Sequence, residues 1–185
     1  MIALDRSGSM EPLALEVVDS FNGMLNVLPA DSYLSLVQFD SLRGADVTIS
    51  VKPINEVRPL DSEAYRPDGA TPLYDAIAEA IKLGFRGEAV LDATVVGRTL
   101  IAIISDGVEN ASVSTSLSAI RSTLAERASA GWAVRYFGLG PDASAEAANL
   151  GLPASSISEL ALDAGAVGDV FSDIGGGLVT SQARC

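Results

Sequence analysis

Oxygen-bearing side chains gather in three short segments of this 185-residue chain. The segments are Asp5-Arg6-Ser7-Gly8-Ser9, Asp68-Gly69-Ala70-Thr71-Pro72 and Ser105-Asp106-Gly107. Five of their residues carry the carboxylates and hydroxyls of interest: Asp5, Ser7, Ser9, Thr71 and Asp106. Carboxylates combined with hydroxyls form an all-oxygen donor set, which suits octahedral Mg²⁺ or Mn²⁺. The three segments therefore predict a site for a hard divalent cation.

The spacing within the first segment has a mechanical reason. Alternate residues of an extended turn point to the same side, so Asp5, Ser7 and Ser9 can reach one ion. Gly8 lets the backbone bend sharply between the two serines. Taken alone, the same aspartate and serines are also typical of the start of a helix.

Composition argues against several other kinds of chemistry. The chain has no histidine, and its one cysteine is Cys185, so His-based catalysis, zinc clusters and internal disulfides are excluded. A formal net charge of -12 argues against binding to nucleic acid or to anionic membrane surfaces. Hydrophobic residues make up 48% of the chain, which is ample for one core in a domain of this length.

No secretory signal or membrane-spanning segment is expected from the sequence. The apolar run from Met1 to Leu4 is far too short for the apolar region of a signal peptide. The longest apolar runs, such as Leu100 to Ile104, are too short to span a bilayer. We therefore expect a cytoplasmic location, with which a single unpaired cysteine agrees.

The elements that must position the three segments follow from the hydrophobic pattern. Runs of β-branched and apolar residues predict strands over Met1–Leu4, Ser32–Phe39, Asp46–Pro53, Thr99–Ser105, Trp132–Leu139 and Ser155–Ser158. The second and third of these strands are expected to form a hairpin. The continuous apolar run before Asp106 is typical of a central parallel strand that is covered on both faces.

Amphipathic repeats predict helices between the strands. They cover Pro12–Leu28, a helix opened by Pro72, Thr115–Ala130, Asp142–Leu150 and Asp163–Val179. In the helix over Thr115–Ala130, the residues expected to face the core are Leu117, Ile120, Leu124 and Ala128. Residues 56–70 are expected to be irregular, because prolines and a glycine interrupt them.

The alternation of strands and helices predicts one doubly wound α/β domain over residues 1–185. Its sheet is expected to be mostly parallel, with one antiparallel edge strand and helices on both faces. Ligands of such sheets bind beyond the carboxyl ends of the strands, where the strand order reverses. The first strand is expected to be central, with the strand ending at Ser105 beside it. All three oxygen-bearing segments would then converge on one crevice.

Together the three segments resemble the metal-ion-dependent adhesion site (MIDAS) of von Willebrand factor type A (VWA) domains, which have a Rossmann-like fold. The matching pieces are Asp5-Arg6-Ser7-Gly8-Ser9-Met10, Thr71 within Asp68-Gly69-Ala70-Thr71-Pro72-Leu73, and Ser105-Asp106-Gly107. Their order and separation also fit, and the resemblance covers essentially the whole chain. The first motif, with residues 106–112 later, looks most like small stand-alone bacterial members of the family.

The resemblance implies a protein-binding module and not an enzyme. By analogy with the family, Ser7, Ser9 and Thr71 would contact Mg²⁺ (or Mn²⁺) directly, and Asp5 and Asp106 would act partly through water. A Glu or Asp of a protein partner would complete the coordination. Neutral hydroxyls leave the ion electron-poor, so it attracts one more anionic ligand. The chain's own acidity would repel an acidic partner, so the ion must supply the local attraction.

Two alternatives stay open from the residues. A Mg²⁺-dependent phosphatase or phosphotransferase on a similar sheet would use Asp5 as its nucleophile. Such enzymes usually carry a second carboxylate two residues later and a lysine near the phosphate. Here Ser7 holds that position, and lysine occurs only at Lys52 and Lys82. The other alternative is a scaffold with a vestigial site, which the complete set of ligand residues disfavours.

Several polar residues near the motifs have more than one expected role. Arg6 is expected to point away from the metal, toward either a partner or a surface ion pair. Glu109 and Asn110 are expected on a rim loop, where they shape partner choice or are solvated. Asp68 is expected in a turn before Gly69. Asp75 is expected to complement the dipole of the helix that begins near it.

Overall fold

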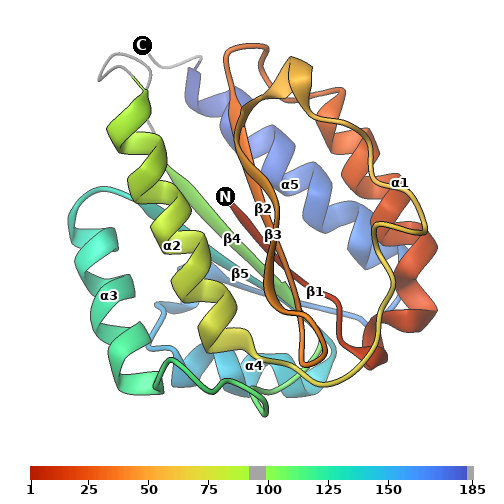
Figure 1. Cartoon of the computed structure of the whole chain (residues 1–185), viewed down its shortest axis with the longest axis vertical. Coiled ribbons are helices and arrows are strands. Elements are labelled where there is room, and N and C mark those ends of the chain that lie inside the picture. Colours follow the sequence, from red (N-terminus) through yellow and green to blue (C-terminus); the bar gives the residue numbers. More distant parts are fainter. Residues whose placement is uncertain (92–98, 183–185) are drawn as a thin grey trace.

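The computed structural model describes residues 1–91 and 99–182, without the side chains of residues 142, 144 and 177–182. Six strands form one sheet, with helices on both of its faces (Figure 1). The strands are β1 (Ile2–Asp5), β2 (Tyr33–Asp40), β3 (Gly44–Pro53), β4 (Leu100–Ser105), β5 (Ala133–Leu139) and β6 (Ile157–Leu160). The helices are α1 (Ala14–Leu25), α2 (Leu73–Val90), α3 (Leu117–Ser129), α4 (Pro141–Asn149) and α5 (Ala164–Gln182). Short 3₁₀ turns are η1 (Gly8–Leu13), η2 (Ile54–Glu56) and η3 (Ala154–Ser156).

The strand order is β3-β2-β1-β4-β5-β6, and all neighbouring pairs are parallel except the β2–β3 hairpin. The predicted fold class is therefore confirmed: a doubly wound, mostly parallel sheet with one antiparallel edge strand. The central position of β1 beside β4 is also confirmed, with Ile2 opposite Ala102. The chain builds outward from β1 in one direction and then from β4 in the other. The strand order therefore reverses between these two strands.

Two hydrophobic clusters hold the helices to the sheet. On one face, α1 and α5 pack against strand residues such as Leu4 and Leu36. On the other face, α2, α3 and α4 pack against Ala3 and Ile103. Successive residues of a strand point to opposite faces, so β1 and β4 contribute to both clusters and are buried on both sides. This burial keeps the ends of β1 and β4 in fixed positions.

Three sequence expectations differ from the structure in detail. Ala128 is exposed, because at the last turn of α3 the guanidinium of Arg127 covers the rings of Phe85 and Trp132 instead. The last strand lies two residues later than expected, because residues 154–156 form the turn η3.

The third difference is the length of the last helix, α5, which continues through the glycines expected to weaken its end. A β-carbon placed on Gly175 would lie 2.9 Å from Cγ2 of Val27 in the turn that follows α1. This glycine therefore permits close packing beside α1 and does not end the helix. No helix in the described ranges is both long enough and apolar enough to cross a membrane.

Candidate metal centre

The three oxygen-bearing segments meet at the carboxyl ends of β1 and β4, the lower edge of the sheet in Figure 1. Ser9 Oγ donates a hydrogen bond of 2.9 Å to Asp106 Oδ1, which joins the first segment to the third. Gly8 N donates to Gly69 O at 3.0 Å, which joins the first to the second. Thr71 Oγ1 lies 3.5 Å from a β-carbon placed on Gly107. The structure thus brings together all the residues that the sequence proposed as metal ligands.

The spacing of these oxygens suits an octahedral ion. Oxygens at about 2.0–2.1 Å from Mg²⁺ lie about 2.9 Å from their neighbours in the octahedron. The Ser7 and Ser9 hydroxyl oxygens are 3.2 Å apart, and Ser9 Oγ is 2.9 Å from Asp106 Oδ1. Within the described residues no three or more His, Cys, Asp or Glu side chains cluster around a common point. An ion here would therefore depend on hydroxyls as well as carboxylates.

Asp5 lies at the buried end of β1, and both of its carboxylate oxygens accept hydrogen bonds. Ser7 N donates to Oδ1 at 2.8 Å, and Ser105 Oγ donates to Oδ2 at 2.5 Å. Burial raises the pKa of Asp5 to about 6, against the opposing effect of these hydrogen bonds. Burial also raises the pKa of Asp106. A bound cation would favour the ionised form of both carboxylates, so the donor set fits a divalent metal.

Thr71 is positioned by the loop that follows β4. Its backbone N–H donates to Asn110 Oδ1 at 2.8 Å, and Asn110 N donates back to Thr71 O at 3.2 Å. The neighbouring Glu109 accepts hydrogen bonds from Tyr74 N at the start of α2 and from both N and Oγ of Ser112. Glu109 and Asn110 thus tie the loop to α2, a role that the sequence did not indicate. Asn110 is also exposed, and a part in partner choice stays a prediction.

Two aspartates support the same loops. Asp75, in the first turn of α2 as expected, accepts hydrogen bonds from Val113 N at 2.9 Å and Ser114 N at 3.2 Å. Burial acts to raise the pKa of Asp75, but the hydrogen bonds outweigh it and lower that pKa. Asp68 accepts from Gly69 N at 2.7 Å, in the turn that the sequence predicted.

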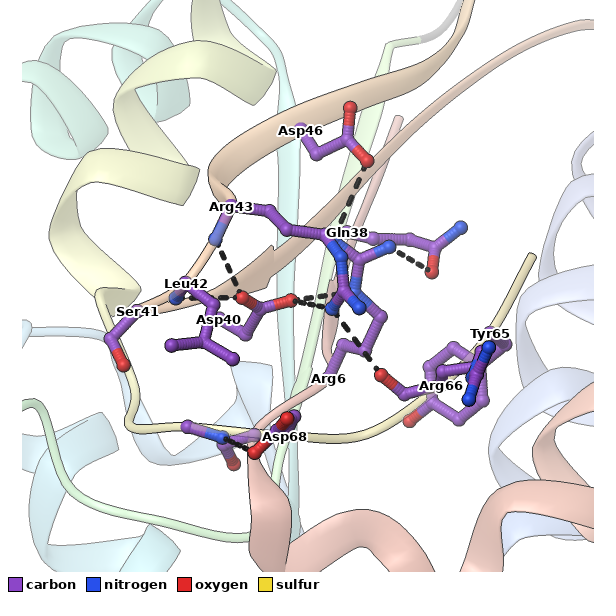
Figure 2. Close-up of polar contacts among 12 residues, drawn as sticks. Arg6, Gln38, Asp40, Ser41, Leu42, Arg43, Asp46, Tyr65, Arg66 and Asp68 are labelled. Atoms are coloured by element: carbon purple, nitrogen blue, oxygen red, sulfur yellow. Dashed lines mark hydrogen bonds and ion pairs between the residues drawn. The ribbon is translucent and has the colours of Figure 1, made fainter. Parts of the chain in front are cut away.

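Arg6 points away from the oxygens of the site and forms an ion pair, as expected, but it lies beneath the site, so the expected surface position and contact with a partner were wrong. Figure 2 shows its side chain crossing to β2, where Nε donates to Asp40 Oδ2 at 2.8 Å. Its other nitrogens donate to Gln38 Oε1 at 3.2 Å and Asp46 Oδ2 at 3.4 Å. Only 4% of Arg6 is exposed, because alternation along the extended segment turns it away from the oxygens on either side.

Sequence reasoning missed two residues that hold Asp5. Ser105 donates to its carboxylate, and the buried Tyr65 hydroxyl donates to its backbone carbonyl at 2.6 Å. Ser105 could have been found from its place at the end of a buried strand beside Asp106. No local signal identifies Tyr65, because it lies in the irregular segment and reaches a residue 60 positions away.

Comparisons with known proteins add evidence on the fold. No protein-family model and no curated protein sequence matches the chain. Among solved structures, the chain is similar to proximal thread matrix protein 1 from the mussel byssus, in a structure with a zinc-occupied MIDAS motif. The TM-score is 0.64 and the sequence identity is 15%, and the match covers 97% of this chain and 45% of the mussel chain. The SpRpn10 VWA domain matches with a TM-score of 0.59 and 11% identity, over 92% of this chain and 91% of that one.

A von Willebrand factor type A structure from Catenulispora acidiphila also matches, with a TM-score of 0.64 and 15% identity. This chain spans less than half the length of the mussel and Catenulispora chains, 45% and 41% respectively. Sequence identities this low show a similar fold, and they do not transfer the activities of those proteins to this chain. The strand order, the helices on both faces and these structural neighbours lead to one conclusion: the chain has the fold of VWA domains.

Proposed function

We propose that this chain is a divalent-metal-dependent protein-binding module. Ser7, Ser9 and Thr71 would contact Mg²⁺ or Mn²⁺ directly, and Asp5 and Asp106 would hold the ion partly through water. When bound, the ion would supply a positive charge that attracts and orients a carboxylate, which a Glu or Asp of a protein partner would provide. The observation that carries the proposal is the position of Ser9 Oγ, which lies 3.2 Å from Ser7 Oγ and 2.9 Å from Asp106 Oδ1. These distances are close to the edge of about 2.9 Å of an octahedron around Mg²⁺. The zinc-occupied MIDAS motif of a structural neighbour supports divalent metal binding in general.

The donor types of the site support an acidic ligand. Uncharged hydroxyls would contact the ion directly, and Asp5 and Asp106 would act partly through water, so the ion keeps an attraction for one more anionic ligand. The formal net charge of -12 means that the rest of the surface repels an acidic partner at long range. A carboxylate ligand would therefore gain its attraction from the ion at short range, which makes binding depend on the metal.

Calorimetric titration tests the metal site. We expect the wild-type chain to bind Mg²⁺ and Mn²⁺, and Asp106→Ala to bind them at least about tenfold more weakly, because a direct or water-mediated ligand is lost. Asp173→Ala, whose carboxylate pairs with Arg135 and not with the site, serves as the control and should bind like the wild type. The proposal fails if the wild type binds neither ion, or if Asp106→Ala binds as tightly as the wild type.

A second experiment tests the partner. We expect the wild-type chain to capture a partner protein from cell lysate in the presence of Mg²⁺, and a chelator to release that partner. The Asp106→Ala variant should not capture it. Substitution of one Glu or Asp in the captured protein by Gln or Asn should abolish its binding. Capture that survives chelation, or that needs no carboxylate of the partner, would contradict the carboxylate part of the proposal.

The burial of Asp5 supports a binding module over a phosphotransferase. A nucleophilic carboxylate must reach phosphorus with a free oxygen, whereas Asp5 is fully buried and both of its oxygens accept hydrogen bonds. Assay of a phosphoester such as p-nitrophenyl phosphate with Mg²⁺ separates the two functions. Turnover that is lost in Asp5→Asn would establish the enzyme instead.

The proposal also includes four predictions made from the sequence. The chain would prefer Mg²⁺ or Mn²⁺ over other divalent ions, lie in the cytoplasm, and be related to small stand-alone bacterial VWA proteins. Residues 1–185 would form a single domain. The metal preference is measurable in the titration described above.

A further inference from the structure

Arg6 and Asp40 form a buried ion pair directly behind the proposed metal ligands. Only 4% of Arg6 is exposed, and Asp40 is fully buried. The Arg6 guanidinium donates to Asp40 on β2, to Gln38 on the same strand and to Asp46 on β3 (Figure 2). A buried charge needs a charged partner and several hydrogen bonds, and this network provides both for Arg6. The pair therefore joins the first metal-ligand segment to the hairpin.

The Arg6 backbone is held on both sides as well. Its N–H donates to Phe39 O at 2.9 Å, and its carbonyl accepts from Asp68 N at 2.9 Å. Its chain neighbours, Asp5 and Ser7, are both proposed metal ligands. These contacts anchor the segment that carries the two proposed ligands to β2 and to the loop before Thr71.

The carboxylate of Asp40 also organises the turn between β2 and β3. Its Oδ1 accepts hydrogen bonds from Leu42 N and Arg43 N, both at 2.8 Å, and Oδ2 accepts from Arg43 Nη1 at 2.9 Å. These contacts fix the conformation of the turn that contains Ser41. The same aspartate therefore binds the metal-ligand segment through Arg6 and the hairpin turn through its other contacts.

The hairpin turn in turn holds the segment that carries Thr71. Ser41 N donates to Ala70 O at 2.9 Å, and Ala70 N donates to Ser41 Oγ at 2.8 Å. Gly69 has a φ of +70°, and a β-carbon there would lie 2.6 Å from Ser41 Oγ, so glycine permits this close approach. A continuous set of contacts thus runs from Ser7 through Arg6, Asp40 and the turn to Thr71.

We propose that Arg6 and Asp40 are positioning residues that set the distance between the Ser7 and Ser9 hydroxyls on one side of the metal centre and Thr71 on the other. This inference rests on the proposed function. Arginine suits the role because its planar fork reaches several acceptors at once, whereas lysine is a single point charge. Mg²⁺ needs near-ideal octahedral geometry at about 2.0–2.1 Å, whereas Ca²⁺ accepts irregular sites at about 2.3–2.6 Å. A loosened site should therefore lose Mg²⁺ affinity more than Ca²⁺ affinity.

The test compares Mg²⁺ and Ca²⁺ dissociation constants, measured by calorimetry, in the wild type and Arg6→Lys. Lysine keeps the positive charge beside Asp40 but loses the fork that also reaches Gln38 and Asp46. We expect Mg²⁺ to bind at least about tenfold more weakly, in the range seen for residues that orient metal ligands, with a smaller change for Ca²⁺. Arg135→Lys is the matched control, because Arg135 pairs with Asp173 away from the metal-ligand segments and should leave both constants unchanged.

Ser41→Ala provides a milder variant, since Ser41 is exposed and the substitution removes only one acceptor from Ala70 N. Ser41→Ala should lower Mg²⁺ affinity by a smaller factor than Arg6→Lys does, and it should again lower Mg²⁺ affinity more than Ca²⁺ affinity. If Arg6→Lys does not fold, Ser41→Ala tests the positioning role in its place. A purely structural role would change the melting temperature and leave the ratio of the two constants unchanged.

The outcomes separate this inference from the proposed function. If the wild type binds no Mg²⁺, the proposed function fails and this inference fails with it. If the wild type binds Mg²⁺ and Asp106→Ala does not, but Arg6→Lys and Ser41→Ala keep the wild-type ratio of Mg²⁺ to Ca²⁺ affinity, the proposed function stands. In that case the positioning role of Arg6 and Asp40 is overturned.

Discussion

Asp5 is the residue at which stability and the proposed metal binding would oppose each other. Without a cation, its burial favours the neutral carboxylic acid, and its pKa rises from 3.8 to about 6. In the proposed metal site, the ionised form would be the one that holds the cation. At neutral pH the folded chain therefore holds a carboxylate in an environment that suits it only when a positive charge is near. This conflict is typical of residues kept for function rather than for stability.

The first prediction concerns pH and Asp5→Asn in the presence of chelator. Because folding raises this pKa, the folded state binds the proton more tightly, so the group's contribution to stability increases as pH falls from about 6 to about 4. At pH 7 we expect the neutral variant to be more stable than the wild type by up to about 3 kcal/mol. Denaturant unfolding should show this advantage shrink at pH 4.5. An equal difference at both pH values would contradict the shift.

At the scale of elements, loops are held to helix starts by side-chain hydrogen bonds. The loop after β4 is bound to the first turn of α2 through Glu109, Asn110 and Asp75. The N–H groups at a helix start have no partners within the helix, so carboxylate and amide oxygens satisfy them well. These contacts place Thr71 against Gly107 and close one side of the metal centre.

The second prediction is that Asn110→Ala loosens Thr71. Loss of the 2.8 Å acceptor for Thr71 N should lower the free energy of unfolding by about 1 kcal/mol and weaken Mg²⁺ binding. Asn26→Ala is the control, because Asn26 makes one exposed hydrogen bond at the end of α1. Calorimetric titration measures the Mg²⁺ affinity of both variants, and denaturant unfolding measures their free energies of unfolding. Unchanged Mg²⁺ affinity in Asn110→Ala would show that the loop is not needed to place Thr71.

The third prediction compares two glycines of α2. A β-carbon on Gly84 would lie 2.3 Å from the rigid ring of Trp132, whereas a β-carbon on Gly87 would lie 3.8 Å from Cγ1 of Val51. Gly84→Ala should therefore destabilise the protein by about 2 kcal/mol through overpacking. Gly87→Ala should stabilise it by about 0.5–1 kcal/mol through helix propensity. Thermal unfolding of both variants measures the difference in stability between Gly84→Ala and Gly87→Ala. This difference would be absent if Trp132 could move away from the new β-carbon at position 84.

At the scale of the whole molecule, the net charge of -12 affects any test with divalent ions. A strongly acidic surface gathers Mg²⁺ non-specifically at low salt, and this weak accumulation also stabilises the folded chain. Exposed charges are screened within about 8 Å at 0.15 M salt. A bound ion inside a ring of ligands is screened much less.

The fourth prediction follows from that difference. In 0.15 M salt, Mg²⁺ should raise the melting temperature of the wild type clearly more than that of Asp106→Ala. At low salt, Mg²⁺ should raise the melting temperature of both. Stabilisation of both proteins to the same extent in 0.15 M salt would mean that the effect belongs to the surface and not to the site.

The sequence by itself determined the fold class, the central place of β1 beside β4 and the three segments that converge. These features depend on local properties: the hydrophobic period of each element, and the rule that parallel strands present their carboxyl ends at one edge. The start of β6 and the extent of α5 were less predictable, because η3 and a close helix contact at Gly175 decided them.

Only the tertiary structure decided what holds the ligands in place. Arg6 meets Asp40 across 34 positions, Thr71 meets Asn110 across 39 and Tyr65 meets Asp5 across 60. Such pairs leave no periodic pattern, because each residue belongs to a different element and its partner is chosen by packing. The proposed donor atoms come from residue types and spacing, whereas their distances arise from the long-range contacts that fix three separate loops against one another.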